Sequence, residues 1–154
     1  MLFGLLFLLI LVAAIGGLQA QAPQLTAPAA ENQARAFAGS FRATAHAALA
    51  YAEAHPGTSG TISPAALAPY MSGWVWLPSA QAQVTAGGLL VVSAVPTGGL
   101  GDAQWISRNL LEDFGDAAYG SVLNGQMVSA NGTVWGTPPA GVVNGEALYV
   151  VDNP

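Results

Sequence analysis

The sequence predicts an α+β protein in which a long helix packs on an antiparallel β-sheet, with a second short helix, behind an N-terminal transmembrane helix. Three observations lead to this prediction. The first 18 residues are apolar, residues 28–54 are rich in Ala with a helical period, and the rest of the sequence has short β-rich runs between Gly and Pro. We therefore expect a membrane anchor over residues 1–18, a linker over 19–28 and one soluble domain over 29–154.

The opening run, MLFGLLFLLILVAAIGGL, contains no charged side chain. As a helix it would be about 27 Å long, close to the roughly 30 Å of bilayer hydrocarbon. A cleaved signal peptide is the alternative, since Leu18-Gln19-Ala20 has the small-x-small pattern of a cleavage site. The run has no basic flank and is longer than a signal requires, which favours a retained anchor. Ala13 and Gly17 form a small-xxx-small pair at which two such helices could pack, although they are also simply small residues near a helix end.

The charge balance excludes several classes of partner. The protein has eight acidic residues, three Arg and no Lys, with a net charge of −5. A nucleic-acid surface or a lipid-binding patch needs clustered cations, which three scattered Arg residues cannot supply. The absence of Cys excludes disulfides, thiolate nucleophiles and Cys metal sites, and it is compatible with the periplasm.

The Ala-rich segment predicts one long helix from Pro28 to about Ala54. His55-Pro56-Gly57 ends it, because Pro56 disfavours helical backbone at the residue before it. Ser63-Pro64 is typical of an N-cap followed by a short helix through Ala68. The apolar positions of the long helix recur at a 3.6-residue period, and they are Phe37, Phe41, Ala45, Ala48 and Ala52, with Tyr51 beside them.

The remainder predicts mainly strands. The runs 74–77 and 89–95 are β-rich and each ends at a Pro. Residues 102–114 have a helical period with Asp102 as the cap. Asn-Gly pairs, which favour type I′ hairpin turns, stand at Asn124, Asn131 and Asn144. The tail is therefore expected to be an antiparallel meander that closes with residues 148–151.

The sequence shows no constellation that would carry catalysis. His46 and His55 are nine residues apart, which does not suit a metal pair on a helix. The Gly98–Gly101 loop lacks the Lys of a phosphate-binding loop. The acidic residues of 112–116 have no ligand loop around them and are interpreted as solvated side chains. We expect no catalytic residue, no cofactor and no metal.

Trp74 and Trp76 are the candidate partner-interface residues. In a strand, alternate side chains lie on the same face. Two tryptophans on one face could anchor a protein partner or stack on sugars. Core packing of one of them is the alternative.

Short motifs around Tyr51, His55-Pro56-Gly57, Gly60-Thr61-Ile62 and Leu67 resemble the PilM family that accompanies thin (type IVb) conjugative pili. The likeness continues through Gly88-Leu89-Leu90-Val91 and the Gly/Pro-rich tail to Gly136 and Gly145. The order of anchor, spacer, helix and β-rich tail also gives the protein a pilin-like layout. The resemblance implies an inner-membrane protein of pilin transport or the pilus basal body, without enzymatic activity.

These expectations define one function and its alternatives. The first is an assembly component, held by a single N-terminal span in the bacterial inner membrane with its domain in the periplasm. It would act on other pilus or secretion proteins, and it could form homo-oligomers. The alternatives are a pilin-like minor subunit of the fibre and a periplasmic cell-wall-binding protein or hydrolase.

Overall fold

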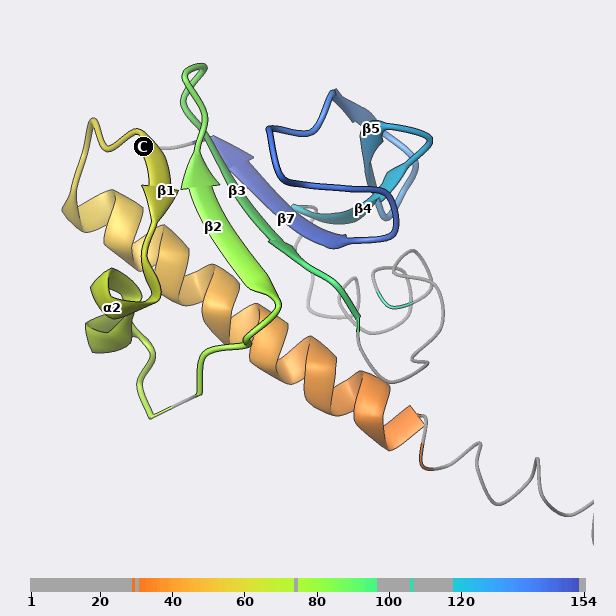
Figure 1. Cartoon of the computed structure of the whole chain (residues 1–154), viewed down its shortest axis with the longest axis horizontal. Coiled ribbons are helices and arrows are strands. Elements are labelled where there is room, and N and C mark those ends of the chain that lie inside the picture. The colour runs from red at the N-terminus through yellow and green to blue at the C-terminus, as the bar shows by residue number, and fades with distance from the viewer. Residues whose placement is uncertain (1–28, 30, 74, 97–105, 107–117, 153–154) are drawn as a thin grey trace, which may run out of the picture.

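The α+β architecture is confirmed by a computed structural model that describes residues 29, 31–73, 75–96, 106 and 118–152. A long helix over residues 31–54 crosses a seven-stranded antiparallel sheet obliquely (Figure 1). The predicted membrane helix over residues 1–18 and the predicted helix over 102–114 lie outside the described residues, apart from Ile106. Within the described ranges, no helix combines the length and the hydropathy needed to cross a membrane.

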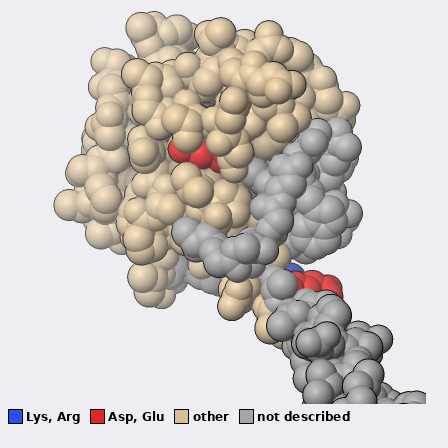
Figure 2. All heavy atoms as spheres, turned by 45° about the vertical axis from the view of Figure 1, so that its right-hand side comes forward, with Lys and Arg blue, Asp and Glu red and all other residues tan. Residues whose placement is uncertain are grey.

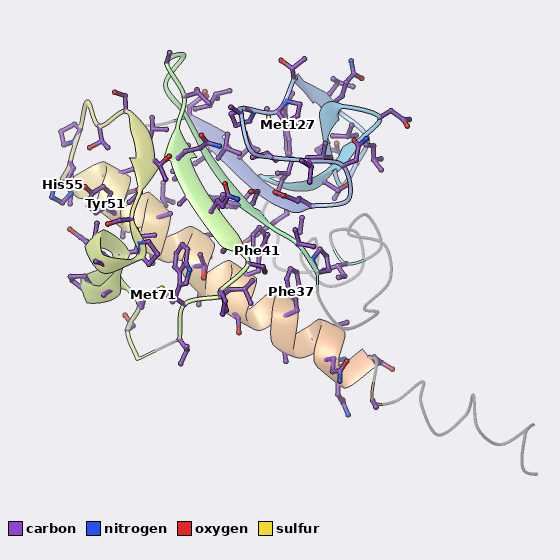
Figure 3. All side chains as sticks on the ribbon, in the orientation of Figure 1. Phe37, Phe41, Tyr51, His55, Met71 and Met127 are labelled. Carbon is purple, nitrogen blue, oxygen red and sulfur yellow. The ribbon has the colours of Figure 1, made fainter. Side chains whose placement is uncertain are left out.

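The long helix places its predicted apolar stripe against the sheet. Phe37 and Phe41 are nearly parallel, with ring centroids 5.9 Å apart, and both point from the helix toward the sheet (Figure 3). On the solvent side, Arg35 pairs with Glu31 at 2.7 Å. The stripe is confirmed, since all its predicted members are buried, namely Phe37, Phe41, Ala45, Ala48 and Ala52.

The helix ends where Pro56 predicts. The ring nitrogen Nδ1 of His55 lies 2.9 Å from the carbonyl oxygen of Tyr51, and the two rings stack with centroids 4.3 Å apart. A carbonyl oxygen only accepts, so this contact satisfies one of the carbonyl groups left open at a helix C-terminus. The backbone then turns back through Gly57, whose φ is 84°.

The second short helix is also confirmed. Strand β1 (Gly60–Ile62) leads into α2 (Pro64–Leu67) and the 3₁₀ turn η1 (Ala68–Tyr70). Ser63 is the N-cap of α2, and its Oγ accepts a hydrogen bond from the Ala66 amide at 3.3 Å. Leu67 is fully buried and ties this segment to the core.

The predicted strand over residues 74–77 is wrong for the residues that the structure describes there. Residues 75–77 have no strand hydrogen bonding. Instead, the Leu77 carbonyl accepts from the Ala80 amide at 2.8 Å, and the strand begins at Ala80. The turn carries Pro78, which has no N–H to donate to a strand partner.

The sheet departs from a simple meander. Its order is β1-β2-β3-β7-β4-β5-β6, so the last strand lies between the two earlier groups. It pairs with β3 over six positions, from Leu89 opposite Asp152 to Ala94 opposite Ala147, and with β4 on its other side. The prediction that the tail closes as a meander is therefore wrong. The remaining strands are β2 (Ala80–Val84), β3 (Leu89–Ala94), β4 (Tyr119–Leu123), β5 (Gln126–Ser129), β6 (Val134–Gly136) and β7 (Ala147–Asp152).

The three Asn-Gly pairs have different structures. Asn124 and Gly125 have φ values of 51° and 74°, as a type I′ turn between β4 and β5 requires. Near Asn131 the hairpin uses only Gly132 at positive φ. Asn144 joins no hairpin, because its segment crosses to β7; its Oδ1 accepts from the Gly125 amide at 2.8 Å. The prediction of a hairpin turn is thus confirmed at Asn124 and wrong at Asn144.

Both faces of the sheet carry a core. The helix covers one face, where Tyr119 and Tyr149 lie 5.0 Å apart beneath Phe41. The opposite face is covered by the protein's own later strands and by the 137–146 connection, which contributes Val142. The buried residues of this second core are Val91, Val122, Met127, Val142, Leu148 and Val150.

Candidate functional site

The tryptophan pair expected from the sequence is only partly described. Trp76 is half-buried and packs against the helix-side core, as the core-packing alternative holds. Val75, just before it, is 81% exposed. Trp74 lies outside the described residues, and so do the membrane-packing candidates Ala13 and Gly17. Of the four candidates, the structure therefore places Trp76 alone.

The two histidines are far apart in role. His55 packs on Tyr51 at the end of the long helix (Figure 3). His46 is exposed on the same helix, and its ring lies 6.4 Å from that of Tyr149. Among the described residues, no three His, Cys, Asp or Glu side chains converge as metal ligands would.

The structure shows one site that was not foreseen, a hollow of about 270 Å³ between the long helix and the turn that follows η1. Met71 is buried beside the helix at this place (Figure 3). We call it the helix–turn hollow, and it is lined by Gly39, Arg42, Ala43, His46, Tyr70, Met71 and Ser72.

The local sequence explains why space opens there. Gly39 and Ala43 are four residues apart on the helix, so two small side chains follow each other on one face. Opposite them, Ser72 and Gly73 have φ values of 46° and 83°. Positive φ is uncommon for a residue with a side chain, and at Ser72 it turns the backbone sharply away from the helix. The small residues and the turn together leave the hollow.

The polar lining comes from the same helical spacing. Arg42 and His46 are four residues apart, so the guanidinium and imidazole groups stand on one face of the helix. Sequence analysis had placed both off the apolar stripe. The signal it missed is that small, cationic and aromatic positions repeat together at helical spacing on this second face.

The charge around the hollow is sparse. Arg35 and Arg42 are the cations of the described residues, and Arg35 is paired with Glu31 outside the hollow. Figure 2 shows a face made almost wholly of uncharged residues, with a small blue area beside a red one. In such surroundings, the Arg42 charge acts on a bound group with little competition from other cations.

The lining suits binding rather than catalysis. Arg42 supplies a fixed positive charge with several N–H donors, and Ser72 and Tyr70 supply hydroxyl groups. Gly39, Ala43 and Met71 give apolar walls. A nucleophile activated by a base requires hydrogen-bonding distance between the two groups, and within the described residues the His46 ring makes no hydrogen bond to either hydroxyl. What the arrangement can do is hold a group that accepts hydrogen bonds.

Comparison with known proteins decides the family. The family model described as PilM matches residues 8–150. The chain belongs to the PilM family. This match spans the long helix, all of β1 to β6 and most of β7, together with every residue that lines the helix–turn hollow. The resemblance noted in the sequence is thereby confirmed, and the protein is pilus-related.

A solved structure shares the fold of this PilM family member. It is the crystal structure of a protein described as PilM from Escherichia coli B7A, with a TM-score of 0.57 and 21% sequence identity. The alignment covers 79% of this chain and 93% of that chain. At this identity the likeness establishes a common fold. No curated protein matches the sequence.

Proposed function

We propose that this PilM family protein is a non-enzymatic assembly component of a type IVb (thin) conjugative pilus or a related secretion apparatus. The observation that carries the proposal is the family match, which extends from residue 8, inside the apolar run, to residue 150. The protein would act by contact with other pilus proteins. Its domain would lie in the periplasm, held to the inner membrane by residues 1–18.

The tether gives the proposal its mechanism. A helix of 18 apolar residues is long enough to keep a domain at the membrane. The domain behind it has a binding hollow and exposed apolar side chains, Val75 and Val143 among them, at 81% and 58% exposure. Anchoring raises the effective concentration of such a surface beside other membrane-bound components. Position beside partners is then the function, and no chemical step is needed.

A gene deletion complemented by two versions of the protein tests this proposal. One version is the full-length protein, and the other replaces residues 1–18 with a cleavable signal peptide, so that the same domain is exported without a tether. We expect the deletion strain to lose thin pili, the full-length protein to restore them and the untethered domain to restore few or none. Normal piliation of the deletion strain would overturn an assembly role, and full rescue by the untethered domain would overturn the anchor.

The main alternative is a pilin-like minor subunit, which the helix-on-sheet layout also fits. Fractionation separates the two. An assembly component stays with the inner membrane after pili are sheared from the cells, whereas a subunit is recovered in the sheared fibres in fixed ratio to the major pilin. Intact-mass measurement of the purified protein shows in the same preparation whether residues 1–18 are retained.

A further inference from the structure

We propose that the helix–turn hollow is a recognition site for a peptide carboxylate on a partner protein, with Arg42 as the residue that binds it. This inference rests on the proposed assembly function and names the partner's chemistry. The carboxylate can be the C-terminus of the partner or an Asp or Glu side chain, and binding of small peptides distinguishes these two sources.

The size of the hollow fits part of a peptide. Its volume of about 270 Å³ corresponds to roughly nine water molecules at about 30 Å³ each. A carboxylate alone would leave most of this space empty. A carboxylate with the carbon atoms that carry it would fill the remainder against Gly39, Ala43 and the buried Met71. The hollow is smaller than the usual site for a cofactor or a drug-sized ligand.

The donors favour a carboxylate over other acceptors. Arg42 presents five N–H donors, enough to serve more than one acceptor, in a planar fork that matches the two oxygens of a carboxylate. It is half-buried, so water screens its charge less than it screens a fully exposed one. Tyr70 and Ser72 add hydroxyl donors on the opposite wall.

The charge of the lining argues against a phosphate. Among the residues that line the hollow, Arg42 is the one with a permanent positive charge. One guanidinium neutralises a carboxylate, whereas it leaves a phosphate dianion with about one uncompensated charge. The lining also lacks the helix N-terminus and consecutive backbone N–H groups that phosphate sites use, since the helical residues in it lie in the interior of the 31–54 helix.

The left-handed turn is the part of the site that costs stability. Ser72 has a φ of 46° although it carries a side chain, and such conformations cost on the order of 1 kcal/mol or more. Glycine in this position would remove the strain, but it would also remove the hydroxyl at the rim of the hollow. The presence of Ser here is consistent with a binding role for its side chain.

The test uses three small peptides and the full-length protein in a non-ionic detergent, with binding followed by NMR shifts of the hollow residues. The peptides are acetyl-Ala₃ with a free carboxylate, acetyl-Ala₃-amide, and acetyl-Ala-Glu-Ala-amide. We expect one or both carboxylate peptides to shift the signals of Gly39, His46 and Ser72, and the neutral amide to bind at least tenfold more weakly. The stronger of the two carboxylate peptides identifies the source. Equal binding of the neutral amide, or no binding by any peptide, would overturn the proposal.

Two variants assign the binding to Arg42. Arg42→Gln should weaken carboxylate binding at least tenfold. Arg35→Gln is the matched control, because it removes the same charge seven residues earlier on the same helix but outside the hollow. Binding that is unchanged in Arg42→Gln, or lost equally in both variants, would contradict the site. Ser72→Gly, which relieves rather than adds backbone strain, should weaken binding while the fold is retained, so a folding defect in Arg42→Gln does not remove the test.

The same variants separate this inference from the assembly role. If the deletion strain lacks pili and Arg42→Gln restores them fully, the protein is an assembly component but the hollow is not its contact. If the deletion strain is fully piliated while the peptides still bind through Arg42, the hollow binds carboxylates and the assembly role is wrong.

Discussion

The two faces of the sheet have cores that are built in different ways. On the helix face, small Ala side chains alternate with large aromatic ones, so Phe41 reaches Tyr119 with ring centroids 6.1 Å apart. On the opposite face, medium-sized side chains of β3, β4, β5 and β7 meet Val142 from a connecting segment. One core depends on a single helix laid across the sheet, and the other depends on the sheet and its connection covering themselves.

The difference has a consequence for stability. The helix face gains most from a few large side chains, and Phe41 is fully buried there. The opposite face gains from tight backbone approach, with Gly120 against Val128 and Ser129 of β5. Both faces also bury a hydroxyl oxygen without a hydrogen-bond partner, Thr44 Oγ1 on the helix and Ser93 Oγ in β3.

The largest effect is expected from Phe41→Ala. It removes the ring that joins the helix to Tyr119 and leaves a cavity, which should lower the free energy of unfolding by about 4 kcal/mol. Chemical denaturation of the full-length protein in detergent measures this. Met127→Ala makes the comparable truncation on the opposite face and is expected to cost about 2 kcal/mol. A larger loss in Met127→Ala would reverse the ranking of the two faces.

The next effect tests the close approach on the opposite face. A Cβ at Gly120 would meet the Val128 carbonyl oxygen, with Trp135 Cζ3 at 2.7 Å and Ser129 Cα at 2.9 Å. Two of these atoms belong to backbone and cannot rotate away, so Gly120→Ala should lower the free energy of unfolding by about 3 kcal/mol. Gly87→Ala is the control, since its nearest neighbour would be Thr85 Oγ1 at 3.8 Å. Similar denaturation midpoints for the two variants would show that β4 and β5 are not packed this closely.

The smallest effect has the opposite sign. Ser93→Ala removes a buried hydroxyl that lacks a partner, and Thr44→Val replaces another with a methyl group of similar size. Each should raise the free energy of unfolding by about 0.5–1 kcal/mol, because the desolvation cost of the hydroxyl disappears. Thermal melting is sensitive enough to detect this. If either variant melts at a lower temperature, its hydroxyl has a hydrogen-bond partner in solution.

Sequence patterns reached the helix side of this comparison well. The stripe from Phe37 to Ala52, the stop at Pro56 and the cap at Ser63 all depend on residues within a few positions of one another, and all are confirmed. The same holds for the type I′ turn at Asn124. In each case the backbone preference of one or two residues, or the period of a single helix, was sufficient.

The opposite face and the hollow could not be predicted in this way. Asn144 has the same Asn-Gly sequence as Asn124, yet it binds the Gly125 amide because β7 inserts beside β4. Arg42 and His46 gained a common role only when the turn at Ser72 came to lie against their side of the helix. Nothing local in the sequence specifies which distant segment arrives there.

By itself, the sequence determined the elements that local backbone energetics govern, together with the family and the class of the fold. The tertiary structure decided the place of the last strand, the second core and the helix–turn hollow, because these depend on contacts between residues that are distant in the sequence. Helical period and turn chemistry are set by near neighbours, whereas strand order is set by which apolar faces can be buried together. The candidate carboxylate site exists only at that second level.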